Sequence, residues 1–330
     1  MDLPSSVVNF YHSQRRRHYR KANLVAVVFL LINFCQALRA QSFGINNGPT
    51  TTFTTPTITT MSSNNNDDNN NKPCYETVLF DMDGVLAEVS KSYRQAILLT
   101  CQHYGATSVT HETITAWKVR GNANNDWVLS RDLILNDPNG QNDVTLEQVT
   151  ETFEKFYQGT ADTPGLYKLE TLLPTRELLL QLQQRSKGGM GIVTGRPRPD
   201  CMKFLTDMNL LDLFPQDACY CAGDGPSKPN PFGVQKVCEV LGVPPSKRVV
   251  LIGDTPDDVR AAVAAGCSAV GVSTAEAVVA PGQSHADAPL CRAMMECGAD
   301  MILPPGFGEL LDYMEPVDAS KDVAEKNEAS

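Results

Sequence analysis

The sequence predicts an α/β fold built on a Rossmann-like parallel sheet, and three observations lead to that prediction. Short apolar segments alternate along the chain with longer amphipathic ones, the order expected for parallel strands joined by crossover helices. The apolar segments lack polar alternation, as is typical of strands buried on both faces. One stretch between the first two strands is too long for a loop and contains only helical patterns, which predicts an all-helical inserted domain.

The expected elements begin after Pro73. Strands are predicted at residues 77–80, 191–194, 218–221, 249–253 and 269–272. Helices that cross over between them are predicted at residues 175–185, 199–208, 232–241 and 256–265. Within the insert, helices are predicted at residues 88–104, 111–120, 125–135 and 146–158. A turn and short strand at residues 298–303 are expected to close the sheet.

The composition is that of a globular enzyme and argues against one class of partner. Of the 330 residues, 42% are apolar and 20% are charged, which is sufficient for a sizeable core. The net charge is −10, and residues 1–72 carry more basic than acidic side chains, so the acidic excess lies in the remainder. We therefore expect no nucleic-acid partner, and a small anionic substrate would need a local cation.

Residues 1–72 have the character of a targeting segment. A basic patch that includes Arg15 and Lys21 precedes an apolar run at residues 24–38. That run fits the core of a signal peptide better than a membrane span, which needs about 20 residues. Residues 43–71 are rich in Thr, Ser and Asn and are expected to be disordered.

The targeting segment resembles the two-part presequence of algae with complex plastids, including Phe43 shortly after the apolar run. The resemblance implies delivery to a plastid through the endoplasmic reticulum. The alternatives are secretion and a single-pass membrane anchor. No stable membrane association of the mature protein is expected.

The ten cysteines show no zinc-binding spacing. Most lie in apolar runs, so we expect buried thiols in a reducing compartment. The alternative is a redox-regulated pair, with Cys291 and Cys297 as exposed partners. Three histidines without a partner pattern are expected to be structural or exposed: His103, His111 and His285.

Polar residues follow the first four predicted strands at the points where these strands end. They are Asp81 and Asp83 after the first, Thr194 and Gly195 after the second, Lys228 after the third, and Asp254, Asp257 and Asp258 after the fourth. The carboxyl ends of parallel strands meet at one edge of a sheet, so these side chains should lie close together. Singly, each has an ordinary explanation as a helix cap, a solvated charge or a helix-start acid. Together, in this order, they predict a catalytic edge.

The ordered set resembles the haloacid dehalogenase superfamily of phosphoryl-transfer enzymes. The resemblance rests on Asp81-Met82-Asp83-Gly84, Thr194, Lys228, and Gly253-Asp254 with Asp258. It covers about residues 74–314, and Asp257 is an acid beyond the family pattern. It implies a catalytic core of residues 73–87 and 173–315, a helical cap of residues 88–172, and a disordered tail of residues 316–330. A cap inserted after the first motif is the subclass I arrangement of phosphoglycolate phosphatases and β-phosphoglucomutases.

The resemblance implies a chemical role for each motif residue. Asp81 is the expected nucleophile, and Asp83 the acid and then the base of the reaction. The segment Thr194-Gly195-Arg196-Pro197 is expected to open a helix. Thr194 and the following amides, that of Gly195 among them, are expected to hold the phosphoryl oxygens. Lys228 is expected to offset the charge of nucleophile and phosphate.

The resemblance also implies Mg²⁺ as the cofactor. Its expected protein ligands are Asp81, Asp254 and the backbone carbonyl of Asp83. Asp258 is expected to position Lys228 or a metal-bound water. For Asp257 two alternatives are open, a metal ligand and an exposed acid at a helix start.

The expected function is Mg²⁺-dependent hydrolysis of a small phosphate ester, with phosphoglycolate as the first candidate. The alternatives are a phosphomutase of the β-phosphoglucomutase kind and a membrane-tethered binding module without turnover. A dehalogenase has no use for Asp83. In the cap, Lys118, Arg120 and Asn124 are expected to contact a carboxylate or hydroxyls of the substrate; the alternative is a solvated helix–loop junction.

Overall fold

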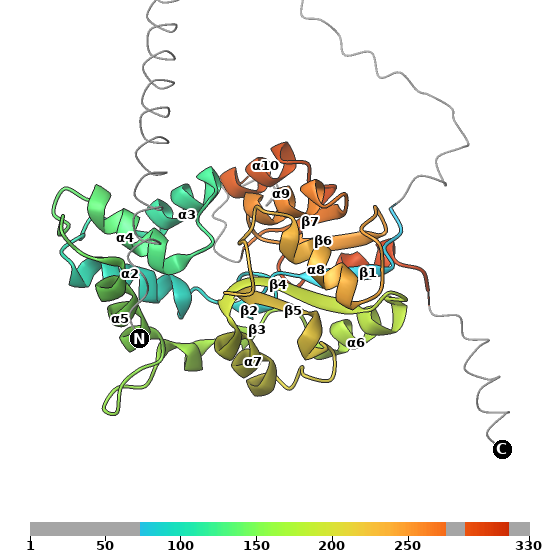
Figure 1. The fold of residues 1–330 in the computed structure, drawn as a ribbon, viewed down its shortest axis with the longest axis horizontal. Helices are drawn as coiled ribbons and strands as arrows, with labels where there is room; N and C mark the ends of the chain where they lie inside the picture. Colours follow the sequence, from blue (N-terminus) through green and yellow to red (C-terminus); the bar gives the residue numbers. More distant parts are fainter. Residues whose placement is uncertain (1–72, 275–287, 317–330) are drawn as a thin grey trace, which may run out of the picture. The chain divides into compact units, whose positions relative to one another are not determined.

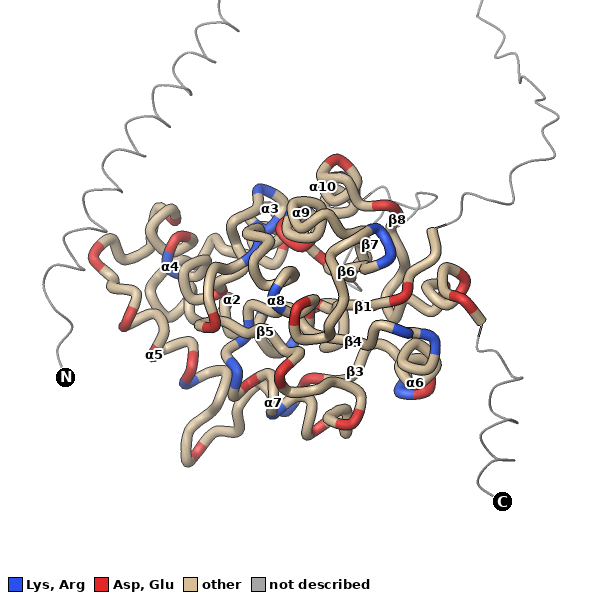
Figure 2. The backbone as a smooth tube through the Cα atoms, turned by 45° about the vertical axis from the view of Figure 1, so that its right-hand side comes forward, with Lys and Arg blue, Asp and Glu red and all other residues tan. Residues whose placement is uncertain are grey.

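The computed structural model describes residues 73–274 and 288–316 (Figure 1). The predicted targeting segment, nearly all of the predicted tail, and His285 lie outside the described residues. Within the described ranges, no helix is both long enough and apolar enough to cross a membrane. Figure 2 shows acidic and basic positions spread over the sheet layer and the insert alike.

A parallel sheet of six strands forms the centre of the fold, in the order β5-β4-β1-β6-β7-β8. The strands are β1 (Thr77–Phe80), β4 (Met190–Pro197), β5 (Cys219–Ala222), β6 (Val249–Gly253), β7 (Ser268–Val272) and β8 (Met301–Leu303). Each corresponds to a predicted strand. The central strand β1 pairs with β4 on one side and β6 on the other. The loop after β1 therefore emerges between the residues that end β4 and β6.

Helices cover both faces of the sheet (Figure 1). They are α6 (Arg176–Arg185), α7 (Arg198–Asp207), α8 (Phe232–Val240), α9 (Pro256–Ala264) and α10 (Pro289–Glu296). Alternate residues of β1 enter different cores, because side chains of a strand point to opposite faces. Phe80 packs with Leu179 and Phe204 of α6 and α7, whereas Leu79 packs with the residues of α8 to α10. The alternation of strand and helix thus gives the predicted layered fold; α10 is an element that the sequence pattern did not predict.

Four helices make up most of the insert: α2 (Tyr93–His103), α3 (His111–Arg120), α4 (Asp126–Asn136) and α5 (Leu146–Tyr157). Thr110 and Thr145 begin α3 and α5 with capping boxes. The side chain of Asn125 accepts the amide of Val128 at the start of α4. These local hydrogen bonds satisfy first-turn amides and fix where the three helices begin.

A two-stranded antiparallel ribbon joins the insert to the sheet. It pairs β2 (Ala87–Glu88) with β3 (Thr171–Leu172). The prediction that the first cap helix begins at residue 88 is therefore wrong, because that residue belongs to the ribbon and α2 begins at Tyr93. Both ribbon strands are too short to give a period-2 signal. Three short 3₁₀ helices complete the described elements: η1 (Leu166–Leu169), η2 (Gln216–Ala218) and η4 (Gly308–Tyr313).

The described cysteines are all free thiols, and all except Cys74 and Cys297 are buried. The alternative of an exposed pair is wrong for Cys291, which lies in α10 and is buried. The structure places His103 on the surface and His111 partly buried at the start of α3.

Candidate active site

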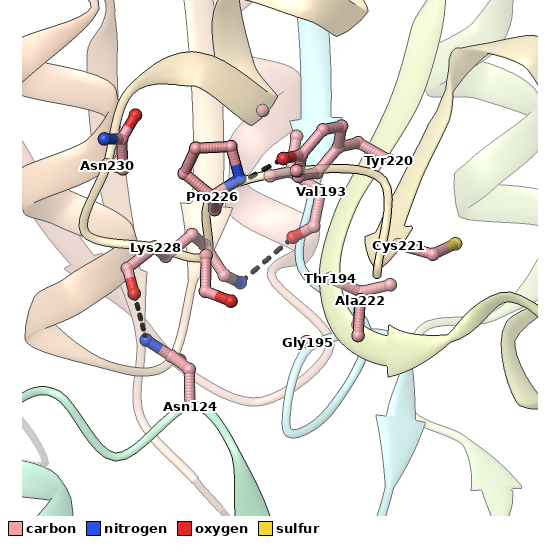
Figure 3. A pocket seen from close by; sticks show the side chains of 13 residues that line it. Asn124, Val193, Thr194, Gly195, Tyr220, Cys221, Ala222, Pro226, Lys228 and Asn230 are labelled. Atoms are coloured by element: carbon pink, nitrogen blue, oxygen red, sulfur yellow. Dashed lines mark hydrogen bonds between the residues drawn. The ribbon is translucent and has the colours of Figure 1, made fainter. Parts of the chain in front are cut away.

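The carboxyl ends of the central strands bring the predicted motif residues together. Asp81 follows β1, Thr194 lies in β4, and Asp254 follows β6. Lys228 reaches the same edge from the loop between β5 and α8. Its Nζ atom lies 2.9 Å from Asp81 Oδ1 and 2.5 Å from Asp258 Oδ1. It also donates a hydrogen bond of 3.0 Å to a carbonyl of β4, as Figure 3 shows. One buried cation therefore holds the expected nucleophile and a second carboxylate.

The electrostatics of this edge show an excess of negative charge. Burial by itself lowers the pKa of Lys228, but the carboxylates of Asp258 and Asp81 outweigh it and raise that pKa. Burial raises the pKa of Asp81 to about 8 although Lys228 opposes the shift. Burial, together with the charge of Asp258, raises the pKa of Asp254 to about 6. The single positive charge of Lys228 thus does not balance the negative charges of the three buried acids, Asp81, Asp254 and Asp258.

The same acids fit a divalent cation. Asp81, Asp254 and Asp258 each place one carboxylate oxygen within 4.8 Å of the others, and hard cations prefer such oxygen ligands. Asp258 is the least available of the three. Lys228 contacts its Oδ1 atom at 2.5 Å, and the amide and hydroxyl of Thr255 donate to its Oδ2 atom at 3.0 and 2.6 Å. Asp81 and Asp254 are therefore the side chains best placed for a cation, while Asp258 positions Lys228.

Two glycines allow close approaches at this edge. Gly84 has φ of +76°, and a Cβ atom there would collide with the carboxylate of Asp254. A Cβ atom at Gly195 would lie 2.6 Å from the carbonyl oxygen of Asn124, in the insert. Only a residue without a side chain lets the loop after β1 reach Asp254, and lets the insert reach β4.

The surroundings of Thr194 differ from the prediction. Strand β4 continues to Pro197, with a shift of register relative to β5 between Val193 and Pro197. The helix α7 begins only at Arg198. The hydroxyl of Thr194 accepts the backbone amide of Arg196 at 3.2 Å. The prediction of a phosphate site at a helix start is therefore wrong. The backbone amides after Thr194 belong to the irregular end of β4, where the register relative to β5 shifts.

The side chain of Asp83 pairs with Arg196. The Oδ1 atom of Asp83 lies 2.6 Å from Nε and 2.5 Å from Nη2 of Arg196. Arg196 also contacts Glu170 Oε2 through Nη1 at 2.9 Å. The two acids of the first motif are thus held by two different cations.

Asp257 fits neither of the two predicted alternatives. It is 2% exposed, so the exposed-acid alternative is wrong. Its Oδ2 atom accepts the amide of Asn122 at 2.6 Å and the side-chain amide of Asn124 at 2.8 Å. Its Oδ1 atom accepts Nη1 of Arg260 at 3.0 Å. Both oxygens bond protein groups, and Asp257 fastens the loop between α3 and α4 of the insert to α9.

The three predicted cap residues lie in different places. Asn124 donates to the carbonyl of Lys228 at 3.2 Å and lines a cavity with Thr194 and Gly195 (Figure 3). Lys118 pairs with Asp126 at 3.3 Å, and both side chains are 13% exposed. Arg120 is exposed, with its guanidinium 5.4 Å from the ring centroid of Trp117. The structure therefore brings Asn124 to the site, whereas the substrate contacts of Lys118 and Arg120 stay predictions.

A second cavity separates the sheet edge from the insert. The sheet side contributes Asp83, Gly195, Arg196 and Pro197; the insert contributes Tyr93, Asn124, Asn125, Asp126 and Trp127. Asp83 opens into this cavity, with its side chain 24% exposed. A leaving group bound beside Asp83 would therefore be enclosed by the insert.

Sequence reasoning missed three residues at the site. Arg196 was available in the segment after Gly195 but was treated as part of a helix start. Glu170 and Arg94 carry no local signal. Arg94 of α2 places Nη2 3.8 Å from Asp254 Oδ2, and only the folded insert brings it there.

The sequence-family model of the haloacid dehalogenase-like hydrolases matches residues 75–266 of the chain. The chain belongs to this family. The insert follows the first family motif, which is the subclass I position.

Curated relatives carry two kinds of name. A protein of Phytophthora nicotianae named imidazoleglycerol-phosphate dehydratase is 45% identical over 243 residues, which are 73% of this chain and 53% of that protein. This chain therefore spans only about half of that relative. Phosphoglycolate phosphatases of Yersinia pseudotuberculosis and Pseudomonas savastanoi are 26% and 29% identical; each match covers 59% of this chain, and 80% and 68% of the respective relative.

Solved structures of the family share the fold. A haloacid dehalogenase-like hydrolase of Bacteroides fragilis has a TM-score of 0.55 at 23% identity, over 72% of this chain and 99% of that chain. A predicted phosphoglycolate phosphatase of Haemophilus somnus has a TM-score of 0.52 at 19% identity, over 72% of this chain and 97% of that chain. At these identities the likeness concerns the fold alone.

Proposed function

We propose that the chain is a Mg²⁺-dependent phosphatase that hydrolyses a small phosphomonoester through an aspartyl-phosphate. One observation carries the proposal: the nucleophile and the proton carrier are held separately. Asp81 lies 2.9 Å from Lys228, while Asp83 faces the cavity beneath the insert. Family membership and the group of buried acids support the same reading.

In the first half of the proposed reaction, a carboxylate oxygen of Asp81 attacks phosphorus. The bond from phosphorus to the leaving oxygen breaks, and that oxygen takes the proton from Asp83. Lys228 offsets the negative charges of Asp81 and the phosphate, so that the two anions can approach each other. Thr194 and the amide of Gly195 hold the phosphoryl oxygens. The products are an alcohol and an aspartyl-phosphate.

In the second half, Asp83 is ionised and acts as the base. It takes a proton from water as the water oxygen attacks phosphorus, and the bond from phosphorus to Asp81 breaks. Inorganic phosphate leaves, the carboxylate of Asp81 is restored, and Asp83 carries its proton again. The cycle therefore needs no group beyond the phosphate ester and water for its atoms to balance.

Mg²⁺ held by Asp81, Asp254 and the backbone carbonyl of Asp83 would supply positive charge to the phosphoryl group. The raised pKa values of the two aspartates support a cation here, since burial penalises their uncompensated charge. Asp258 is assigned to Lys228 and not to the metal, because its oxygens already bond Lys228 and Thr255.

Phosphoglycolate is the first substrate to test. Several relatives at 24–30% identity carry the name phosphoglycolate phosphatase, and the insert places Arg94 and Lys118 among the acids of the site. The name of the Phytophthora relative contains a phosphate ester with an imidazole ring, imidazoleglycerol phosphate. An imidazole-bearing alkyl phosphate is therefore the second substrate to test.

The purified protein would be assayed with Mg²⁺ on p-nitrophenyl phosphate and then on a panel of phosphate esters, with Asp81→Asn as the control. Release of inorganic phosphate by the wild type and not by the control is the expected result. An isomerised sugar phosphate without phosphate release would instead favour the mutase. Activity no higher than that of the control on every ester would leave the binding module as the remaining alternative.

We also propose that residues 1–72 direct the protein to a plastid through the endoplasmic reticulum. The support is the order of basic patch, apolar run and hydroxyl-rich segment. A fluorescent fusion that carries these residues should accumulate in plastids; retention in a membrane or secretion would favour one of the alternatives.

A further inference from the structure

The side chain of Arg196 is fully buried, and it joins the proton carrier to the insert. Its exposed fraction is 0%, and its guanidinium contacts Asp83 on one side and Glu170 on the other, at 2.5 and 2.9 Å. Glu170 is itself 3% exposed. A buried arginine between two acids is costly to form and holds one geometry only when its surroundings fix it.

The surroundings of Arg196 do fix it. Its guanidinium lies over the rings of Tyr93 and Phe204, at 4.8 and 5.3 Å from their centroids. Tyr157 donates to Glu170 Oε1 at 3.1 Å and accepts from Arg196 Nη1 at 3.4 Å. Aromatic faces and acids thus enclose the cation, which leaves it little freedom to change its orientation.

The groups that hold Arg196 come from the connections between insert and sheet. Glu170 directly precedes β3, and Tyr157 is the last residue of α5. The partner of β3 is β2, which follows the loop of Asp83, and Asp83 itself forms a bridge with Ala87 of β2. The orientation of Asp83 and the placement of the insert therefore depend on the same buried cation.

We propose that Arg196, held by Glu170, is a positioning residue that fixes the carboxyl group of Asp83 for proton transfer. Arg196 grips the Oδ1 atom of Asp83, while Asp83 opens into the cavity beneath the insert. Asp83 is then correctly aimed only while the connection to the insert holds Glu170 against Arg196. This inference rests on the function proposed above.

The test separates the two halves of the reaction on p-nitrophenyl phosphate. Nitrophenolate leaves without a proton, so the initial burst of nitrophenolate reports attack by Asp81. The later steady rate reports hydrolysis of the aspartyl-phosphate, which needs Asp83 as base. Arg196→Lys keeps the charge but loses the fork that grips Asp83. We expect it to keep most of the burst rate and to lower the steady rate about 10²-fold. KM should fall together with the steady rate, because the aspartyl-phosphate accumulates when only its hydrolysis is slowed.

Three further variants test the two acids, Asp83 and Glu170, between which Arg196 lies. Asp83→Asn should show the same pattern, and the double variant Asp83→Asn with Arg196→Lys should be no slower than Asp83→Asn alone. Glu170→Gln, which removes one anchor and leaves Arg196 in place, should lower the steady rate about tenfold. The matched control is Arg198→Lys. Arg198 is the first residue of α7 and forms a partly exposed ion pair with Asp224, so its replacement should leave both rates unchanged.

Three results would overturn the inference while the proposed function stands. One is an equal fall of burst and steady rate in both Arg196→Lys and Glu170→Gln, which indicates a merely structural role. Another is a double variant slowed by the product of the single effects. A rise of KM without a fall of the steady rate would likewise contradict it, because Arg196 would then be a substrate contact. A wild-type protein without turnover on any ester would instead defeat the proposed function, and this inference with it.

Discussion

Two buried cations lie at the same edge of the sheet, and each holds two carboxylates. Lys228 joins Asp81 to Asp258 at 2.9 and 2.5 Å, and all three residues belong to the sheet layer. Arg196 joins Asp83 to Glu170 at 2.5 and 2.9 Å, and Glu170 belongs to the connection with the insert. The expected nucleophile is therefore fixed by the sheet layer alone, whereas the proton carrier is also fixed by the insert.

The two steps of the proposed reaction should therefore depend on the insert to different degrees. The Nζ atom of Lys228 contacts Asp81, Asp258 and a carbonyl of β4, all outside the insert, so these contacts should prepare the nucleophile before a substrate is enclosed. The Arg196 cluster shares its acids with the ribbon of β2 and β3. A change in the placement of the insert should therefore disturb proton transfer first and attack by Asp81 only secondarily.

The largest expected effect is at the nucleophile. Asp81→Asn should lower turnover of p-nitrophenyl phosphate by at least about 10⁴-fold, because no aspartyl-phosphate can form. Burst and steady rate should both vanish. Thermal unfolding serves as the control and should show a folded protein, since asparagine retains the shape. Turnover near the wild-type level would remove Asp81 from the mechanism.

Lys228→Met comes next and tests the first cation. It should slow burst and steady rate alike, about 10²- to 10³-fold, because Lys228 supports the attack itself. It also leaves Asp81 and Asp258 buried without their cation, which should lower the free energy of unfolding by about 3–5 kcal/mol. Rapid-quench kinetics and urea unfolding measure the two effects. If Lys228→Met lowered only the steady rate, as expected for Arg196→Lys, the proposal that the two cations support different steps would be contradicted.

A smaller effect is expected at Asp257, which connects the insert to α9. Its carboxylate accepts hydrogen bonds from Asn122, Asn124 and Arg260. Asp257→Ala removes the acceptor for Asn122 and Asn124, so the loop of the insert should be held less often against the sheet. We expect kcat/KM to fall about tenfold while the burst rate at saturating substrate changes little. Arg260→Gln is the matched control on the other carboxylate oxygen. Equal losses in both variants would show that the loop contact has no special role.

The smallest expected effect is a pH dependence of stability in the metal-free protein. The pKa values of Asp81 and Asp254, about 8 and about 6, lie above their ordinary values. The folded protein therefore keeps these protons to a higher pH than the unfolded chain, and its stability falls as the pH rises through 6 and 8. With chelator present, Tm should drop by about 5 °C between pH 5.5 and 8.5. Mg²⁺ should reverse most of that drop, and Asp254→Asn should reduce it; a Tm independent of pH and Mg²⁺ would contradict the cation site.

Much of the fold and half of the site were predictable from local patterns. Apolar runs gave the strands because buried parallel strands tolerate few polar residues. The predicted starts of the insert helices at residues 111 and 146 are confirmed, and there the structure shows capping boxes at Thr110 and Thr145. The ribbon of β2 and β3 was missed, since two residues per strand carry no periodicity. The predicted strand end at Thr194 was wrong, because a register shift prolongs β4 to Pro197 and residue patterns do not encode such a shift.

The sequence by itself determined the chemistry of the sheet edge. Asp81, Lys228 and Asp254 each follow a strand, and Thr194 lies near the end of β4. Parallel pairing brings strand ends to one edge. The partners of those residues were decided only by the tertiary structure. Arg196 meets Glu170 across 26 positions of sequence, and Asp257 meets Asn124 across 133. Such pairings depend on how the insert packs against the sheet, and that packing is the sum of many contacts that no single segment of the chain carries.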